Sequence, residues 1–296
     1  MKYVITGSLG KVSRPLTQKL VAAGHDVTVI SRDPGKKEEI ELLGAKAAIG
    51  SVEDIRFLSD TFSGAVAVYT MVPPNFGAAD MKKFIAATGS NLATAIKLSG
   101  VRYVVNLSSV GAHLPDGCGP VSGLFYVEKA LDQLEDVHVR HLRPGFFYQN
   151  FLTNIGMIRH MGIIGGNYDE NTLMMLVEPA DIAEVAAEEL QNLSFQGKSH
   201  RYVASDEKKA SEIASILGTS IGKPDLKWIG FTDEETYGGM VQNGLPPNVA
   251  QNYTEMGAAL RSGIMGSLYF ENRPGKLGKT KLEDFAAVFA RIYHKG

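Results

Sequence analysis

Short apolar runs alternate with longer amphipathic segments through the first half of this chain. The amphipathic segments predict helices near 11–23, 37–43, 53–62, 79–99 and 121–135. The apolar runs predict strands at 2–6, 26–30, 45–49, 65–70, 101–107 and 137–142. Strands that are apolar at nearly every position are typical of a parallel sheet covered by helices on both faces. We therefore expect an α/β fold with a doubly wound parallel sheet.

The second half is less regular and predicts a smaller, mostly helical lobe. A strand at 173–177, a helix at 180–191 and a strand at 200–204 continue the alternation for some distance. Because ligands of doubly wound folds bind at the carboxyl edge of the sheet, we expect the lobe to cover that edge. The expected division is a core over 1–150 to which 173–228 returns, a substrate lobe over 151–172 and 229–280, and a C-terminal helix over 281–296.

Two glycines stand directly between the first predicted strand and the first predicted helix. Gly7 and Gly10 lie in the segment VITGSLGKVS, and Ser13 takes the place of a third glycine. A glycine at such a junction lets the backbone turn tightly and approach a diphosphate, which then rests on the free N–H groups of the helix N-terminus. The pattern predicts a Rossmann dinucleotide-binding fold, and the alternative is a purely structural turn.

The residues at the end of the second strand indicate which dinucleotide binds. A site that prefers NAD(H) places Asp or Glu there to hold the ribose 2′-hydroxyl, whereas an arginine accommodates a 2′-phosphate. Here the strand ends in Ser31 and Arg32, and the first carboxylate is Asp33. A guanidinium binds phosphate in a bidentate manner, and a carboxylate would repel it. The sequence therefore favours NADP(H) over NAD(H), and the alternative is that Arg32 is an ordinary solvated charge.

Charge and composition narrow the range of partners. The net charge of −2 and the isoelectric point near 6.4 give no reason to expect a nucleic-acid partner. No apolar run approaches the ~18 residues of a membrane span, and the first residues already predict a core strand. Cys118 is the single cysteine, which suits a reducing compartment, so we expect a cytoplasmic protein. His138 and His141 lie three apart on a predicted strand and so face opposite sides, which argues against a metal site.

Several motifs along the chain together resemble the NmrA-like branch of the atypical short-chain dehydrogenase/reductase superfamily. That branch includes triphenylmethane reductase, type-2 quinone oxidoreductase and the isoflavone reductases. The match is thin beyond about residue 225. After the glycine turn at 6–13, the motifs are SR at 31–32, GSVED at 50–54, TMVPP at 70–74, NLSSVGA at 106–112, Lys129, RPGFFYQN at 143–150, VEPADIAEVA at 177–186 and GKSHRYVAS at 197–205.

The resemblance implies positions for the whole ligand site. Ser31 and Arg32 would hold the adenosine phosphate, and Ser51 and Val52 would border the adenine. Asn150, with Phe146 and Phe147, would lie at the mouth between the lobes, where substrate enters. The diphosphate would be lined by Gly7, Ser8, Leu9, Gly10, Lys11 and Val12, and the ribose and nicotinamide would be bordered by Thr70, Met71, Val72, Pro73 and Lys129.

The wider superfamily carries a catalytic tyrosine and a lysine four residues apart on one helix, and this chain departs from that pattern. The position four before Lys129 is Phe125, and Tyr126 is displaced by one residue. A shift of one residue turns the phenol by about 100° around the helix axis. Tyr126 is therefore a weak candidate for the acid, and Lys129 is expected to hold the nicotinamide ribose or else to be solvated. Ser109, with Ser108, stands where the superfamily places a substrate-polarising serine, although both could satisfy nearby backbone groups instead.

Three functions are consistent with these observations. The first is an NADP(H)-dependent oxidoreductase that transfers hydride to a small, planar, electron-poor quinone, dye, enone or carbonyl compound, since such acceptors need little more than a bound cofactor and a correct approach. The second is a non-catalytic NAD(P)-sensing regulator with a protein partner, which the missing tyrosine favours. A nucleotide-sugar epimerase is disfavoured, because it would need both the tyrosine and the lysine. The substrate and the oligomeric state cannot be predicted from the sequence.

Overall fold

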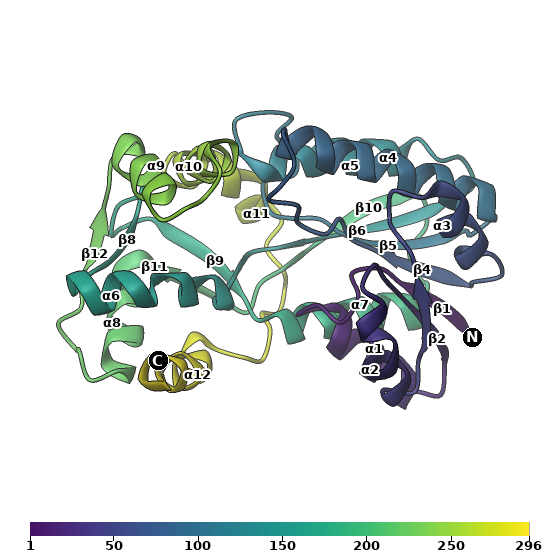
Figure 1. Ribbon diagram of the computed structural model, residues 1–296, viewed down its shortest axis with the longest axis horizontal. Helices are drawn as coiled ribbons and strands as arrows, with labels where there is room; N and C mark the ends of the chain where they lie inside the picture. The colour runs from purple at the N-terminus through teal and green to yellow at the C-terminus, as the bar shows by residue number, and fades with distance from the viewer. Residues whose placement is uncertain (296) are drawn as a thin grey trace.

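The computed structural model describes residues 1–295, and its centre is a seven-stranded sheet in which all neighbouring strands are parallel (Figure 1). The strand order is β10-β6-β5-β4-β1-β2-β3. Strands β2 and β3 are added on one side of β1 and the later strands on the other, so the order of the strands reverses between β1 and β4. The predicted doubly wound sheet is therefore confirmed. Its strands are β1 (Lys2–Ile5), β2 (Asp26–Ser31), β3 (Lys46–Ile49), β4 (Ala67–Thr70), β5 (Tyr103–Leu107), β6 (His138–Pro144) and β10 (Lys198–Val203).

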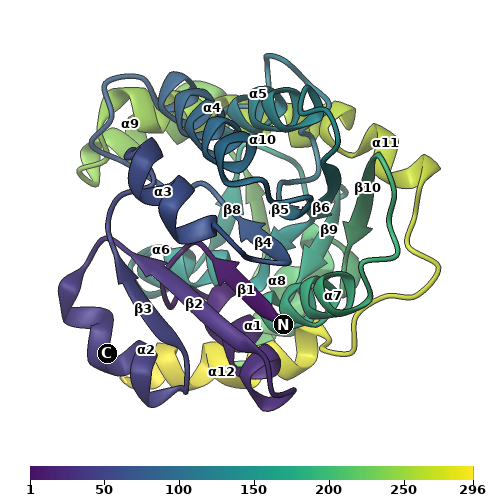
Figure 2. The same cartoon turned by 90° about the vertical axis from the view of Figure 1, so that its right-hand side faces the viewer.

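Helices cover both faces of this sheet (Figure 2). One face carries α3 (Ile55–Phe62), α4 (Met81–Ser99) and α5 (Pro120–Asp132), and the other carries α1 (Ser13–Ala22), η1 (Pro34–Lys36), α2 (Lys37–Leu42) and α7 (Pro179–Asn192). Two separate apolar clusters fill the two interfaces, and both contain alternate residues of the same strands. Val4 packs on the α4 side, and Tyr3 and Ile5 pack on the α1 side. This division explains why the strands are apolar throughout.

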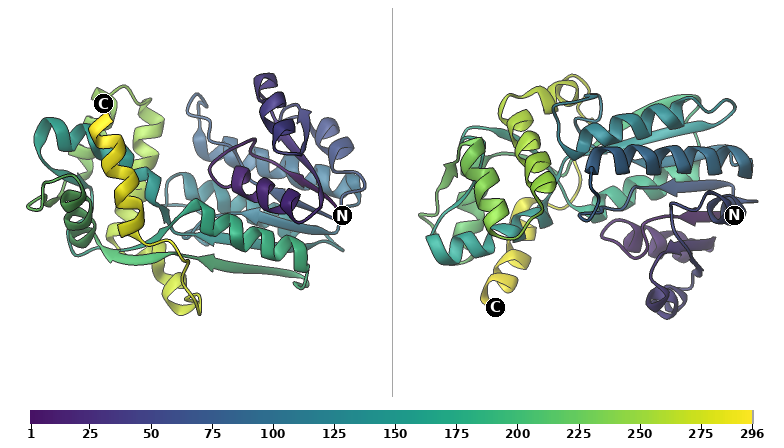
Figure 3. Two further views of the ribbon diagram at one scale, coloured as in Figure 1. Left: turned by 90° about the horizontal axis from the view of Figure 1, so that it is seen from below. Right: turned by 45° about the horizontal axis from the view of Figure 1, so that its top comes forward.

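A smaller lobe lies beyond the carboxyl edge of the sheet and has its own apolar cluster (Figure 3). It contains a three-stranded sheet, β11-β9-β7, and a two-stranded sheet, β12-β8, but its helices hold far more residues than its short strands. Its elements are β7 (Phe146–Phe147), η2 (Tyr148–Asn154), α6 (Ile155–Met161), β8 (Ile164–Gly166), β9 (Leu173–Val177), β11 (Asp206–Lys209), α8 (Ala210–Ser220), β12 (Trp228–Gly230), α9 (Asp233–Gln242), α10 (Pro247–Arg261), η3 (Ile264–Gly266), α11 (Ser267–Glu271) and α12 (Leu282–Lys295).

The segment 173–228, which we expected beside the core, is shared between the two clusters. Helix α7 and strand β10 lie in the core, whereas α8 and β12 pack into the cluster of the lobe. Strand β9 explains the crossing, because its alternate residues point to opposite sides: Leu176 belongs to the lobe cluster and Val177 to the core cluster. Helix α12 also packs into the lobe, and residue 296 of the expected C-terminal helix lies outside the described residues.

Helices α4 and α5 approach each other closely because a glycine lies at their crossing. A Cβ atom added to Gly89 of α4 would lie 2.7 Å from Cγ2 and 2.9 Å from Cα of Val127 in α5. A backbone atom at that distance cannot move aside without shifting the helix. The position of α5 over the sheet therefore depends on the missing side chain.

We predict that Gly89→Ala destabilises the fold by about 1–3 kcal/mol, because the added methyl group overpacks this crossing. Gly238→Ala in α9 is the matched control, since no atom lies within 4 Å of the position that its added methyl group would take. That control should be neutral or stabilise by up to about 1 kcal/mol through its better helix propensity. Urea unfolding measures both changes, and equal stabilities for the two variants would contradict the close approach.

Candidate coenzyme site and active site

The glycine turn lies at the carboxyl end of β1 and has no space for side chains. Gly7 has φ of 89°, a value that favours glycine. A Cβ atom there would lie 2.8 Å from Sδ of Met71 and 2.8 Å from Oγ of Ser13. The next residue, Ser8, also has a positive φ, of 54°. Glycine at position 7 is therefore required by the positive φ and by the packing of Met71 and Ser13, as in the tight turn of a dinucleotide site.

Backbone N–H groups point out of this turn without protein partners. The amide of Gly10 donates to the carbonyl of Gly7 at 3.1 Å, but within residues 1–295 no backbone or side-chain acceptor faces the amides of Lys11, Val12 or Ser13. These groups form the N-terminus of α1, where unsatisfied N–H groups and the helix dipole favour an anion. The residues present therefore fit the diphosphate of a dinucleotide.

Ser13 shows how the third glycine of the motif is replaced. Its side chain is buried, and its hydroxyl donates to the carbonyl of Thr6 at 3.0 Å. The hydroxyl thus satisfies a backbone group at the end of β1 and fits between helix and strand. The substitution keeps the close packing that a glycine would otherwise permit.

The end of β2 lies beside the glycine turn. The Ser8 hydroxyl donates to Oγ of Ser31 at 2.9 Å, and Ser31 is buried. Arg32 is exposed and takes part in none of the ion pairs found among residues 1–295. The Asp33 carboxylate, in contrast, accepts the amide of Gly35 at 2.8 Å and so caps η1. The acidic group is therefore used locally, and a guanidinium is available beside Ser31.

The segments that follow β3 and β4 lie at the same carboxyl edge of the main sheet as the glycine turn. Ser51 is partly buried, and its hydroxyl accepts the amide of Glu53 at 3.1 Å, while Val52 packs into the apolar cluster beneath α3. At β4, the amide of Met71 donates to Oγ1 of Thr6 at 2.8 Å. Val72 and Pro73, which follow Met71, are likewise partly buried.

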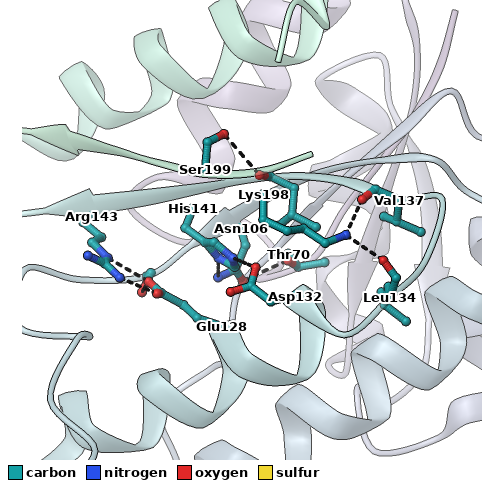
Figure 4. Close-up of polar contacts among 12 residues, drawn as sticks. Thr70, Asn106, Glu128, Asp132, Leu134, Val137, His141, Arg143, Lys198 and Ser199 are labelled. Carbon is teal, nitrogen blue, oxygen red and sulfur yellow. Dashed lines mark hydrogen bonds and ion pairs between the residues drawn. The ribbon is translucent and has the colours of Figure 1, made fainter. Parts of the chain in front are cut away.

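A row of buried polar side chains crosses three neighbouring strands beneath α5 (Figure 4). The Thr70 hydroxyl donates to Oδ1 of Asn106 at 3.0 Å, and Nδ2 of Asn106 lies 3.1 Å from Nδ1 of His141. Nε2 of His141 lies 3.0 Å from Oδ1 of Asp132 at the end of α5. Because the Asn106 amide oxygen already accepts from Thr70, its nitrogen donates to His141, which leaves Nε2 as the donor to Asp132. In this arrangement the side chains of the row satisfy one another's hydrogen-bonding groups.

A second polar cluster lies nearer the carboxyl edge, where Glu128 of α5 meets Arg143 of β6 (Figure 4). The guanidinium donates to the carboxylate through Nε at 3.0 Å and Nη2 at 2.6 Å, and through Nη1 to the Tyr202 hydroxyl at 3.2 Å. The Ser108 hydroxyl donates to Oε1 of Glu128 at 2.5 Å. Burial works against the guanidinium charge, yet the Glu128 carboxylate keeps the pKa of Arg143 above its usual range.

These contacts set the rotation of α5 about its own axis. Glu128 and Asp132 are four residues apart and both point toward the sheet. Phe125 lies about 60° from Glu128 around the helix, whereas Tyr126 lies about 200° away, on the far side. Accordingly, the Tyr126 side chain is 48% exposed. Tyr126 therefore lies on the half of α5 that is turned away from the sheet, and its ring contacts that of Phe125, with the ring centroids 5.2 Å apart.

The other candidate catalytic residues are also constrained. Lys129 is exposed, and its Nζ lies 5.5 Å from the centre of the Phe125 ring. Ser109 donates its hydroxyl to the carbonyl of Val110 at 2.9 Å, and the Ser108 proton is bound to Glu128. Neither serine has a free proton to offer a substrate in this arrangement.

The segment that joins the core to the lobe, β7 and the start of η2, is here called the neck, and it contains the three expected substrate residues. Phe146 packs into the cluster of the lobe and Phe147 into that of the core, because they alternate on β7. Asn150 follows on η2 and is exposed. The three residues thus lie close together in the chain where it passes from the core to the lobe.

Two residues that sequence reasoning missed lie beside this neck. Nε2 of Gln149 donates to both carboxylate oxygens of Glu178 at 2.9 Å, and Oε1 of Gln149 is buried without a partner in the described chain. Burial raises the pKa of Glu178, while Gln149 and the charge of Lys11 in the glycine turn oppose that shift. Glu178 directly precedes Pro179 at the start of α7. Gln149 and Glu178 lie in the motifs RPGFFYQN and VEPADIAEVA, but neither residue is assigned a role by the sequence alone.

Three further features bear on other kinds of chemistry, namely the single cysteine, possible metal-binding groups and possible membrane-spanning helices. Cys118 is fully buried, and burial raises the pKa of its thiol to about 12, so it is a poor nucleophile. Over residues 1–295, no group of three or more His, Cys, Asp or Glu side chains is placed to hold a metal ion. In the same residues, no helix has both the length and the apolar character needed to cross a membrane.

A parallel sheet with a reversal of strand order, a glycine turn and a free helix N-terminus defines a Rossmann dinucleotide-binding protein. The chain belongs to the NAD(P)H-binding family, whose model matches residues 7–192, and within it resembles the atypical short-chain dehydrogenases/reductases. The NAD(P)H azoreductase of Xenophilus azovorans is 24% identical over 255 residues, which cover 86% of this chain and 85% of that protein.

Solved structures share the fold over nearly the whole length. Triphenylmethane reductase of Citrobacter sp., in complex with NADP(H), superposes with a TM-score of 0.78 at 19% identity, covering 98% of this chain and 100% of that one. An NADPH-dependent quinone oxidoreductase of Escherichia coli superposes with a TM-score of 0.77 at 18% identity, covering 97% and 98%. At these identities the likeness establishes the fold alone.

We predict that Glu128→Gln destabilises the protein by about 3–5 kcal/mol, because it leaves the Arg143 guanidinium buried without its counter-charge. The double variant Glu128→Met with Arg143→Met should recover a large part of that loss, since it removes both charges and leaves apolar groups of similar length. Urea unfolding of the three proteins forms the comparison. A double variant less stable than Glu128→Gln would show that the charges are not paired in solution.

Proposed function

We propose that this protein is an NADP(H)-dependent reductase of small, planar, electron-poor compounds such as quinones, azo or triarylmethane dyes, and enones. The observation that carries the proposal is the edge formed by the unpartnered amides of Lys11, Val12 and Ser13 with Arg32 beside Ser31. Asp33, the first acidic residue after Arg32, caps η1 through the amide of Gly35. The arrangement supports binding of a coenzyme that carries a 2′-phosphate.

The proposed class of substrate follows from the lack of an available proton donor on α5 and the neighbouring serines. When bound, the reduced nicotinamide supplies a hydride. Phe125 takes the position four residues before Lys129, and the Tyr126 phenol lies on the half of α5 that is turned away from the sheet, which argues against proton donation from this helix. The hydroxyl protons of Ser108 and Ser109 are held by protein acceptors. A substrate that accepts hydride without simultaneous proton donation, such as a quinone or a cationic dye, suits this site, because water protonates the product afterwards.

The protein then contributes binding, orientation and exclusion of water. Phe146 and Phe147, one on each side of β7, would offer apolar surface to a planar substrate at the neck, and Asn150 would orient it through its exposed amide. Lys129 would hold the coenzyme ribose, reached by turning its flexible side chain from the Phe125 ring. Positioning of this kind accounts for much of the rate of a hydride transfer.

The similarities support the same class. The relative described above, at 24% identity, is an NAD(P)H azoreductase, and the superposed structures include reductases of triphenylmethane dyes and quinones. All of these substrates are conjugated and electron-poor. A non-catalytic NAD(P) sensor is the second candidate, and the specific observation in its favour is that neither Tyr126 nor the two serines presents a proton to the neck. The same observation argues against a nucleotide-sugar epimerase.

The test is coenzyme binding and turnover by the purified protein. We expect NADPH to bind more tightly than NADH by at least about tenfold, because a charged hydrogen bond to the 2′-phosphate contributes roughly 1.5–3 kcal/mol. Arg32→Gln should remove most of that preference, whereas Arg291→Gln, an exposed residue of α12, should leave it unchanged. Calorimetry measures the affinities.

Turnover is assayed as NADPH oxidation with a panel of quinones, azo dyes, triarylmethane dyes and enones. Oxidation of NADPH with at least one class supports the reductase. Tight coenzyme binding with no oxidation across the panel would favour the sensor. Absence of any coenzyme binding would refute both functions.

We further predict that Tyr126→Phe retains kcat within about twofold of the wild type and leaves its pH profile unchanged, because the phenol lies on the far side of α5. Phe125→Tyr is the informative companion, since it places a phenol four residues before Lys129. If that position reaches the reacting atoms, carbonyl substrates that require a proton should gain more than quinones do. A large loss of kcat in Tyr126→Phe would show that α5 rotates when the coenzyme binds.

A further inference from the structure

Two more cations lie on the segments that follow the glycine turn and the end of β2, the two segments between which a 2′-phosphate would bind. Arg14 belongs to the first turn of α1, and its amide donates to the carbonyl of Gly10 at 3.0 Å, inside the glycine turn. Lys36 ends η1, three residues beyond Asp33. Helix α1 follows the glycine turn that contains Ser8, and η1 follows β2, which ends at Ser31; the hydroxyls of these two serines, which mark the corner of the site, are 2.9 Å apart.

One carboxylate holds both cations. Nη2 of Arg14 donates to Oε1 of Glu39 on α2, and Nζ of Lys36 donates to Oε2 at 2.8 Å. The three side chains are each about two-fifths exposed, at 40% for Arg14, 44% for Lys36 and 39% for Glu39. The bridge therefore lies at the surface beside the ligand edge and does not anchor the core, where its loss would disrupt folding.

The bridge has the chemistry of a phosphate site occupied by a substitute anion. A carboxylate offers two oxygens to two cations, whereas a phosphate monoester offers three oxygens and a charge of about −1.5 to −2 near neutral pH. A guanidinium binds either anion through the same fork of N–H groups. Lys36 lowers the pKa of Glu39, and Arg14 adds to that effect, so the carboxylate is ionised and competes with an incoming phosphate.

We propose that Arg14 and Lys36, together with Arg32, select the 2′-phosphate of the coenzyme, and that Glu39 is a resident anion which the phosphate displaces. This inference rests on the proposed function and adds to it a specificity mechanism. The Glu39 carboxylate keeps the two cations near the corner when no coenzyme is present, and it lowers the affinity for NADPH because its contacts must be broken. NADH carries no 2′-phosphate and leaves the bridge intact.

The test uses two adenosine ligands that lack nicotinamide, namely 2′,5′-ADP and 5′-AMP, in addition to NADPH and NADH. We expect Arg14→Gln to weaken 2′,5′-ADP and NADPH by about tenfold, the lower end of the range for a hydrogen bond to a charged group, because the corner is exposed. Binding of 5′-AMP and NADH should stay within about twofold. Glu39→Gln should strengthen 2′,5′-ADP and NADPH by several-fold and leave 5′-AMP and NADH unchanged.

Arg291→Gln is the matched control for loss of an exposed arginine, and thermal unfolding confirms that each variant is folded. The salt dependence of 2′,5′-ADP binding provides a second readout, which should become shallower in Arg14→Gln because one fewer cation meets the phosphate. Affinity for 2′,5′-ADP unchanged in Arg14→Gln, or weakened in Glu39→Gln, would overturn the inference.

The two proposals fail in distinguishable ways. If Arg32→Gln abolishes the preference for NADPH while Arg14→Gln and Glu39→Gln behave as the wild type, the reductase proposal stands and the displacement mechanism is wrong. If the wild type binds none of the four ligands, the coenzyme site itself is wrong and both proposals fall.

Discussion

The buried ion pair between Glu128 and Arg143 is the interaction on which the geometry of the active region depends. It joins α5 to β6 at the carboxyl edge of the sheet, with Ser108 of the loop after β5 and Tyr202 of β10 completing the hydrogen bonds. Two charges in such a place are tolerated only when each satisfies the other, because an unpaired buried charge costs several kcal/mol. Helix α5 can therefore neither slide nor turn without breaking the pair.

A fixed α5 has a direct chemical consequence. In the wider superfamily this helix presents a tyrosine and a lysine to the reacting atoms, and here Phe125 takes the position of that tyrosine. The rotation that satisfies Glu128 and Asp132 leaves Tyr126 in solvent. On the proposed function, the scarcity of proton donors on this helix favours acceptors that need only a hydride. The coenzyme edge, by contrast, is built from backbone amides and cations and does not depend on α5.

The two groups of ion pairs described above differ in their exposure to solvent. The pair of Glu128 and Arg143 is enclosed and serves to hold elements together, whereas the bridge of Arg14, Glu39 and Lys36 is open to solvent beside the ligand edge. An enclosed pair cannot exchange partners, because each partner would be left desolvated. An open bridge can, since water and an incoming anion compensate for the contact that is lost. The two clusters illustrate how burial decides whether a salt bridge is structural or exchangeable.

The sequence by itself determined the architecture of the core and the expected place of the coenzyme, because both follow from local rules. Continuous apolar strands imply a sheet covered on both faces, and glycines between the first strand and helix imply an exposed backbone turn. It did not show that β9 divides its side chains between two cores, since an apolar strand looks the same whichever neighbours it has. The orientation of α5 and the bridge at Glu39 were decided only by tertiary structure, because each depends on residues that are 15 to 25 positions apart and meet only after folding.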